Sequence, residues 1–153
     1  MSLDRDIDLL RNVVLFSEFS ADQLRLLAFS AEKRTLRAQS ILFRTGERAD
    51  TGFVVIKGTV ELQRTGKGDA VTKEQYGPGS LIGELALVTQ SSRSATAVAI
   101  EDVEVIAVRR ATFRRMLQEY PELAAGLQRR MVERLKETND ALRGVRDRLL
   151  REY

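Results

Sequence analysis

Glu84 and Arg93 are the two residues of this chain whose setting predicts ligand chemistry. Glu84 directly follows a glycine, and Arg93 comes nine residues later, after a short apolar stretch. A planar guanidinium can donate two parallel hydrogen bonds to a phosphate, whereas an ionised carboxylate only accepts, for example from sugar hydroxyls. A phosphate beside a sugar hydroxyl means a nucleotide, so this pair predicts a nucleotide site.

The residues around this pair predict a cradle for the phosphate. Gly79 and Gly83 permit backbone conformations and close approaches that a Cβ would block. Residues 84–87 can then form one helical turn, whose first N–H groups have no acceptor within the helix and carry the positive end of its dipole. The stretch 77–96 is therefore expected to hold one anion. The alternative is an ordinary surface loop with two solvated charges.

Short apolar segments on both sides of this stretch alternate with the period of two that is typical of strands. They lie at 33–37, 41–43, 52–56, 60–63 and 71–76 before it, and at 96–100 and 103–108 after it. Turn residues separate several of them, including Lys57-Gly58 and the hairpin tip 66–70. We therefore expect an antiparallel, jelly-roll-like β-roll over residues 32–109.

Helical patterns precede and follow these strands. Apolar residues from Leu9 to Leu15 predict an N-terminal helix, and Ser20 stands at the N-cap of a second. Residues 110–119 predict another helix, which ends before Pro121, a residue well placed to begin the last helix. The expected fold class is α+β.

One domain of 153 residues is expected, because a chain of this length is too short for two full cores. Its parts are N-terminal helices over 1–31, the β-roll over 32–109 and C-terminal helices over 110–153.

The last helix is expected to form a homodimer. Its apolar face recurs at spacings of four and three, with the roughly 3.5-residue period of a two-stranded coiled coil. The seam residues are Met131, Leu135, Thr138, Leu142, Val145 and Leu149. Packing of the seam on its own β-roll is the alternative, but a helix of about thirty residues is roughly 45 Å long and would overhang so small a domain.

Composition excludes several classes of site. The chain has no cysteine and no histidine, so it lacks disulfides, thiolate nucleophiles, histidine bases and the usual zinc, haem and iron–sulfur ligands. Its 25 basic and 22 acidic residues are interleaved, without the basic block of a nucleic-acid binder. No apolar run has membrane-spanning length and no signal region is visible, so we expect a cytoplasmic protein without a metal cofactor.

The sequence Ile82-Gly83-Glu84-Leu85-Ala86-Leu87, followed by Arg93-Ser94-Ala95-Thr96, resembles the phosphate-binding cassette of the cyclic nucleotide-binding domain family. The resemblance implies that Arg93 pairs with the cyclic phosphate and that Glu84 takes the ribose 2′-hydroxyl. Backbone amides of the short helix and of the residues after Arg93 would complete the cradle. Ser92 stands where many members of the family carry proline. The implied ligand-binding residues are Gly83, Glu84, Leu85, Ala86, Arg93, Ser94, Ala95 and Thr96.

From Arg93 onward the chain also resembles the sensor domains of bacterial catabolite activator-like regulators, whose base-contacting pair falls on Thr138 and Asn139. Thr138 thus has two interpretations: a register residue of the seam, or a base contact that accepts from the adenine 6-amino group and favours cAMP over cGMP. Those regulators continue into a DNA-binding domain, whereas this chain stops at Tyr153. No direct contact with nucleic acid is therefore expected.

A regulatory domain is the function that these features favour. We expect it to bind cAMP, or else cGMP, and to signal through its C-terminal dimer helix to a partner that the sequence does not identify. The alternative is an interaction or dimerisation domain that keeps the fold and binds cyclic nucleotide weakly or not at all. An enzyme is least favoured, because no histidine base, metal cluster or nucleophile accompanies Glu84 and Arg93.

Overall fold

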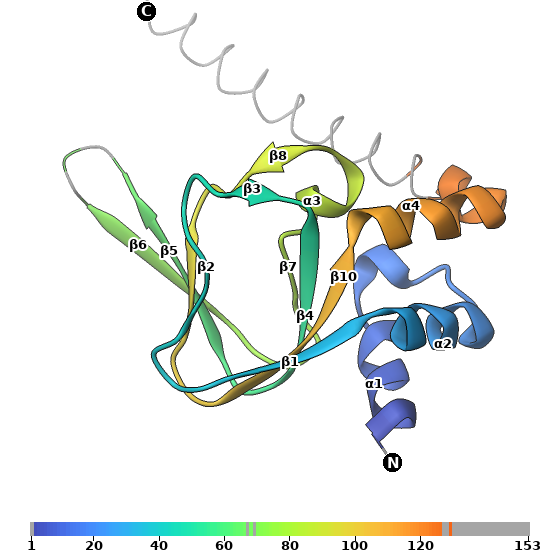
Figure 1. The fold of residues 1–153 in the computed structure, drawn as a ribbon, viewed down its shortest axis with the longest axis horizontal. Helices are drawn as coiled ribbons and strands as arrows, with labels where there is room; N and C mark the ends of the chain where they lie inside the picture. Colours follow the sequence, from blue (N-terminus) through green and yellow to red (C-terminus); the bar gives the residue numbers. More distant parts are fainter. Residues whose placement is uncertain (1, 67, 69, 127–128, 130–153) are drawn as a thin grey trace, which may run out of the picture. The chain divides into compact units, whose positions relative to one another are not determined.

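The computed structural model of the protein describes residues 2–66, 68, 70–126 and 129. The chain divides into two compact units, residues 1–116 and residues 117–153, and every described strand lies in the first (Figure 1). In the second unit residues 121–126 are helical, as the position of Pro121 predicted. The dimer seam lies outside the described residues, and the division into one domain over 1–153 stays a prediction.

The described strands form two four-stranded sheets and one two-stranded sheet, all antiparallel. The first sheet has the order β1 (Glu32–Leu36), β10 (Val103–Arg109), β4 (Thr51–Lys57) and β7 (Leu81–Ile82). The second has the order β2 (Ile41–Phe43), β9 (Thr96–Ala99), β5 (Val60–Thr65) and β6 (Val71–Tyr76). The small sheet pairs β3 (Arg48–Ala49) with β8 (Ser91–Ser92), next to the one-turn helix α3 (Leu85–Val88) (Figure 1).

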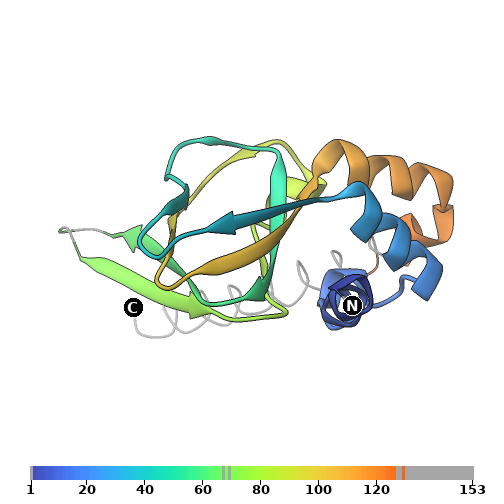
Figure 2. The ribbon, with the colours of Figure 1, turned by 60° about the horizontal axis from the view of Figure 1, so that its bottom comes forward.

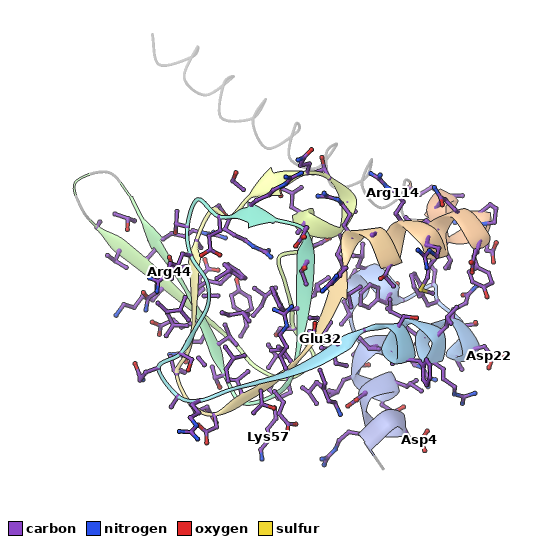
Figure 3. The ribbon with its side chains drawn as sticks, viewed as in Figure 1. Asp4, Asp22, Glu32, Arg44, Lys57 and Arg114 are labelled. Atoms are coloured by element: carbon purple, nitrogen blue, oxygen red, sulfur yellow. The ribbon has the colours of Figure 1, made fainter. Side chains whose placement is uncertain are left out.

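The core of the roll lies between the two larger sheets. It is built from alternating inward-facing apolar residues, with the rings of Phe43 and Phe53 stacked at 6.0 Å between centroids. Figure 3 shows that side chains fill the space which the ribbon leaves open. Gly58 makes the β4–β5 turn possible, because its φ is +87° and a Cβ there would clash with the Asp102 carbonyl oxygen.

Helices α1 (Ser2–Arg11) and α2 (Ala21–Ser30) lie at one end of the roll, as the two views of Figures 1 and 2 show. Ser20 caps α2 as predicted. Its hydroxyl oxygen accepts from the Gln23 backbone N–H at 3.2 Å, and the Gln23 side chain accepts from the Ser20 N–H at 2.9 Å.

The N-terminal helix that the sequence predicted up to Leu15 ends earlier, at Arg11. Val13 is extended, with φ −72° and ψ 124°, and residues 14–16 form a short 3-10 turn, η1 (Val14–Phe16). This turn directs Phe16 into a cluster with Phe19 and Phe113, at ring distances of 5.4 and 6.0 Å. Burial of a large aromatic ring therefore outweighed the local helical pattern.

The predicted fold class is confirmed. The predicted strand segments agree with β1, β2, β4, β5, β6, β9 and β10 to within two residues at each end, and α4 (Arg110–Glu119) has the predicted bounds. The sequence did not predict β3, β7 and β8, which have two residues each. In the described part of the chain, no helix is long and apolar enough to cross a membrane.

Candidate functional site

Arg93 is at the centre of the candidate site, and its backbone is tied to the turn between β2 and β3. The Arg93 N–H donates to the Glu47 carbonyl, and its own carbonyl accepts from the Gly46 N–H, both at 2.8 Å. Ser92, directly before it, pairs with Arg48 across the small sheet. These contacts fix the approach to Arg93 without the proline that many members of the resembled family carry there.

The guanidinium of Arg93 is held on one side by the protein. Its Nη2 donates to the Thr51 carbonyl at 2.7 Å, and its Cζ lies 4.2 Å from the centre of the Phe43 ring. The residue is only 8% exposed, yet no described carboxylate lies within ion-pair distance of it.

Burial lowers the pKa of Arg93, and the negative charges of Asp50 and Glu47 partly oppose this shift. An arginine nevertheless stays charged in a protein. A buried cation without an ion pair is costly, so an anion that enters beside Arg93 would supply a missing partner.

Gly83 makes room for this guanidinium. Its φ is +81°, a conformation that favours glycine, and a Cβ on it would lie 2.5 Å from Nη1 of Arg93. The residue before it, Ile82, is 2% exposed and fixes β7 in the core. Both the backbone conformation and the available space therefore require glycine at position 83.

Glu84 stands at the N-cap of α3, so the predicted single turn is confirmed with a shift of one residue. Its half-buried side chain makes no capping hydrogen bond. Within the turn, the Ala86 N–H donates to the Gly83 carbonyl and the Leu87 N–H to the Glu84 carbonyl, both at 3.1 Å. The amide of Ala86 is therefore already used, although the sequence argument counted the amides of this turn as open donors.

A cavity of about 230 Å³ lies against these elements. Most of the residues predicted to bind the ligand line it: Gly83, Glu84, Leu85, Ala86, Arg93, Ser94 and Ala95. Ile82, Ser91 and Ser92 also line it; they lie in the predicted stretch 77–96 but were not named as ligand-binding. Sequence reasoning had not assigned the remaining lining residues to the site: Phe43, Ala49, Leu62 and Arg64. The lining has two arginines and one carboxylate, Glu84, so its formal charge favours an anion.

Thr96 is placed differently from the other predicted residues. It is not among those that line the cavity, and its Oγ1 lies 3.1 Å from the Thr45 nitrogen and 3.0 Å from the Thr45 hydroxyl. Thr96 thus ties β9 to the same turn that holds the Arg93 backbone. Thr138 and Asn139 lie outside the described residues.

Leu62 and Arg64 are the lining residues that a sequence signal could have found. Side chains two apart on a strand share a face, and Val60, on the same strand, is buried in the core. Alternation therefore places both residues on the inner face of β5, although no motif marks them.

Comparison with known proteins identifies the family of this chain. The sequence profile described as "Cyclic nucleotide-binding domain" matches residues 33–120, which is more than half of the chain. The chain belongs to the cyclic nucleotide-binding domain family. The resemblance first seen in the cassette is thereby confirmed, and the matched range includes the whole β-roll from its second residue onward.

Three curated relatives show the range of proteins that carry this domain. The chain is 38% identical over 67% of its length to the cAMP-dependent protein kinase regulatory subunit of Eremothecium gossypii, and covers 22% of it. It is 30% identical over 82% of its length to the Cyclic AMP receptor protein of Thermus thermophilus, and covers 58% of it. It is 28% identical over 99% of its length to Lysophospholipase nte1 of Neurospora crassa, and covers 11% of it.

Two solved structures are similar over most of their own length. The N-terminal domain of a transcriptional regulator from Streptomyces coelicolor has a TM-score of 0.80 and 35% identity, with 88% of this chain and 96% of that chain covered. A cyclic nucleotide-binding-like protein from Brucella abortus has a TM-score of 0.67 and 45% identity, with 74% and 97% covered.

The chain spans less than two thirds of the length of each of these curated relatives. Cyclic nucleotide-binding domains are regulatory, and the lysophospholipase relative shows that they also occur within enzymes. The expectation that the protein is not an enzyme therefore stays a prediction.

Proposed function

We propose that this domain binds a purine 3′,5′-cyclic nucleotide, with cAMP preferred, and acts as a regulatory module. The observation that carries the proposal is Arg93, a buried cation that lines the cavity and has no ion pair among the described residues. A cyclic phosphodiester carries one negative charge and two unesterified oxygens, which suit one guanidinium.

Glu84 supports a sugar beside that phosphate. Its carboxylate lines the same cavity, and it accepts hydrogen bonds but cannot donate them while ionised. A ribose 2′-hydroxyl is a donor that such a carboxylate would bind. Leu85, which is 58% exposed and also lines the cavity, offers apolar surface to the sugar or the base.

The preference for cAMP rests on the sequence and on relatives. Thr138, as a base contact, would accept from the adenine 6-amino group, where guanine presents a carbonyl. Two curated relatives, the kinase regulatory subunit and the receptor protein of Thermus thermophilus, have cAMP in their names. Dimerisation through the seam at residues 131–149 and a cytoplasmic location belong to the same proposal.

Transmission of the binding event would begin at Arg110, the first residue of α4. Its backbone N–H donates to the Asp50 carbonyl at 2.7 Å, and its Nη1 donates to the carbonyls of Thr89 at 3.0 Å and Ala49 at 3.3 Å. Thr89 directly follows α3, and Ala49 lines the cavity. A displacement of the cassette on binding would therefore reach the first turn of α4 through one side chain, if the ligand binds one arrangement more tightly.

Thermal denaturation with cAMP, cGMP and linear 5′-AMP tests this proposal. A ligand that binds only the folded state stabilises it by RT ln(1 + [L]/Kd), or ~2.7 kcal/mol at a hundredfold excess over Kd. We expect the melting temperature to rise most with cAMP, less with cGMP and least with 5′-AMP. No shift with either cyclic nucleotide at millimolar concentration would favour the alternative, a domain that keeps the fold without binding.

A further inference from the structure

Arg64 brings a second cation to the cavity, and the proposed function does not yet use it. This residue is exposed, lies near the end of β5 and lines the same cavity as Arg93. It belongs to no cassette motif, so neither the phosphate nor the sugar role falls to it by resemblance.

The strand itself directs Arg64 toward the cavity. Val60 is 1% exposed and Leu62 packs against the core, so the residue two further along continues the inner face of β5. The opposite face carries Glu61 and Gln63, whose side chains hydrogen-bond to each other at 2.9 Å. An inner-face position at which the pattern would favour an apolar side chain is thus occupied by arginine.

Arg64 lies next to the residues that follow Arg93. β5 pairs with β9 as far as Gln63 opposite Thr96, so Arg64 is level with the residue before Thr96, the cavity-lining Ala95. Across the other edge of β5, its partner on β6 is Thr72.

Glu74, opposite Leu62 on the same face of the sheet, is the acidic residue that register brings to this side, and its carboxylate accepts from the Tyr76 hydroxyl. None of the described carboxylates forms an ion pair with Arg64, and its neighbour Thr72 is uncharged. A ligand that binds in the cavity would therefore meet this cation as well as Arg93.

The base is the part of a cyclic nucleotide that remains for Arg64. The single phosphate charge is met by Arg93 and the ribose hydroxyl by Glu84, whereas no polar side chain of the cavity lining has yet been assigned to the purine. A guanidinium only donates hydrogen bonds, in a planar fork. Guanine presents two neighbouring acceptors, N7 and O6. Adenine has an amino group in place of O6, and this group donates, as the guanidinium does, so the two cannot form a hydrogen bond there.

We propose that Arg64 is a specificity-determining residue that contacts the N7 and O6 edge of guanine, and that it opposes the cAMP preference expected from Thr138. This inference rests on the proposed function, because it assumes that a cyclic nucleotide occupies the cavity. Its consequence is a narrow preference: the intact protein binds cAMP only slightly more tightly than cGMP, and loss of Arg64 widens this preference for cAMP.

Calorimetric affinities for cAMP and cGMP in Arg64→Ala and Arg64→Lys test this role. Loss of a two-donor contact to guanine lowers cGMP affinity about tenfold to a hundredfold in Arg64→Ala, while cAMP affinity falls much less. Arg64→Lys keeps the charge but loses the fork, so it should restore cGMP binding only in part. Arg44→Ala is the matched control, since Arg44 is exposed, lies outside the cavity lining and is labelled in Figure 3.

Cyclic IMP makes the test independent of the guanine 2-amino group. Its base has N7 and O6 as in guanine but lacks the 2-amino group, so its affinity should fall with that of cGMP in Arg64→Ala. Equal losses for cAMP and cGMP, or a loss for cGMP alone and not for cyclic IMP, would overturn the proposed contact. In both cases cAMP binding by the parent protein would leave the proposed function standing, whereas a parent that binds no cyclic nucleotide would remove both.

Discussion

The two arginines that line the cavity are held in opposite ways. Arg93 is 8% exposed, its backbone is bonded to the turn before β3, and its guanidinium is fixed by Thr51 and Phe43. Arg64 is exposed near the end of a strand and has no ion pair with a described carboxylate. A pre-positioned side chain loses little entropy on binding, whereas a solvated one must be ordered.

This difference matches the two parts of the ligand that the arginines are proposed to contact, the cyclic phosphate and the base. The cyclic phosphate is common to every cyclic nucleotide, so a fixed cation serves all of them. The base differs between ligands, and a side chain that is ordered only on binding adds less affinity but adjusts the choice between them. Removal of Arg93 should therefore affect affinity, and removal of Arg64 mainly selectivity.

Arg93→Leu gives the largest expected effect. It should weaken binding of cAMP and cGMP alike by ~2–5 kcal/mol, as expected when one side of a desolvated charge pair is removed. Calorimetry on the folded variant measures both affinities. If they are unchanged, the phosphate does not lie at Arg93, and the contrast between the two arginines fails.

Although Arg93→Leu should weaken ligand binding, it should not destabilise the protein without ligand. Burial lowers the pKa of Arg93, which is a sign that the charged form is destabilised in the folded state. Burial of a charge without an ion pair is costly, and an apolar side chain at this position removes that cost. The melting temperature without ligand should thus stay the same or rise, while the shift caused by cAMP is lost.

Gly83→Ala should have the next largest effect, because it displaces Arg93 without removing its charge. The new Cβ would lie 2.5 Å from Nη1, so the guanidinium must move and lose a hydrogen bond to the phosphate, at a cost of ~1.5–3 kcal/mol in affinity.

Gly79→Ala is the matched control for that variant. Gly79 also has positive φ, at +88°, but a Cβ there would only touch Leu9 at 4.0 Å. Both variants should lose ~1–3 kcal/mol of unfolding free energy to backbone strain. A fall in affinity that is equal in the two variants would mean that strain, and not the position of Arg93, governs binding.

The sequence predicted the cavity residues that come from the cassette much better than those that come from β5. Arg93 and Glu84 stand in a continuous motif, in which spacing along the chain determines which residues meet. Leu62 and Arg64 reach the same cavity from another strand, through the register of β5 with β9, and that register depends on pairing between distant segments.

Elements that depend on tertiary contacts were missed for a similar reason. The short strands β3 and β8 exist because the turn after β2 pairs with the residues just before Arg93, and two residues carry no periodic signal. The end of α1 was misplaced because Phe16 packs with Phe19 and Phe113, and Phe113 is almost a hundred residues away in sequence. Long periodic strands and the Ser20 cap, which are local, were predicted correctly.

Glu84→Gln tests the sugar contact, and its expected effect is smaller than that of either arginine variant. The amide keeps the shape of the carboxylate but is a weaker acceptor, so binding of cAMP should fall by ~1 kcal/mol. The 2′-deoxy analogue of cAMP lacks the donor and should lose less. Titration of both ligands into the parent and the variant gives this difference directly, and equal losses would remove Glu84 from the ribose role.

Thr138→Val gives the smallest expected effect and completes the comparison at the base end. Valine suits a coiled-coil seam but cannot accept from the adenine 6-amino group, so cAMP affinity should fall by ~0.5–1.5 kcal/mol while cGMP affinity changes less. Arg64→Ala changes selectivity in the opposite direction, and the double variant should therefore return it toward the parent value. Calorimetry with both nucleotides on the parent, the two single variants and the double variant measures these changes in selectivity. Sedimentation checks that the oligomeric state is unchanged. If Thr138→Val alters neither affinity, Thr138 is a register residue of the seam, and the choice of base depends on Arg64 and other cavity residues instead.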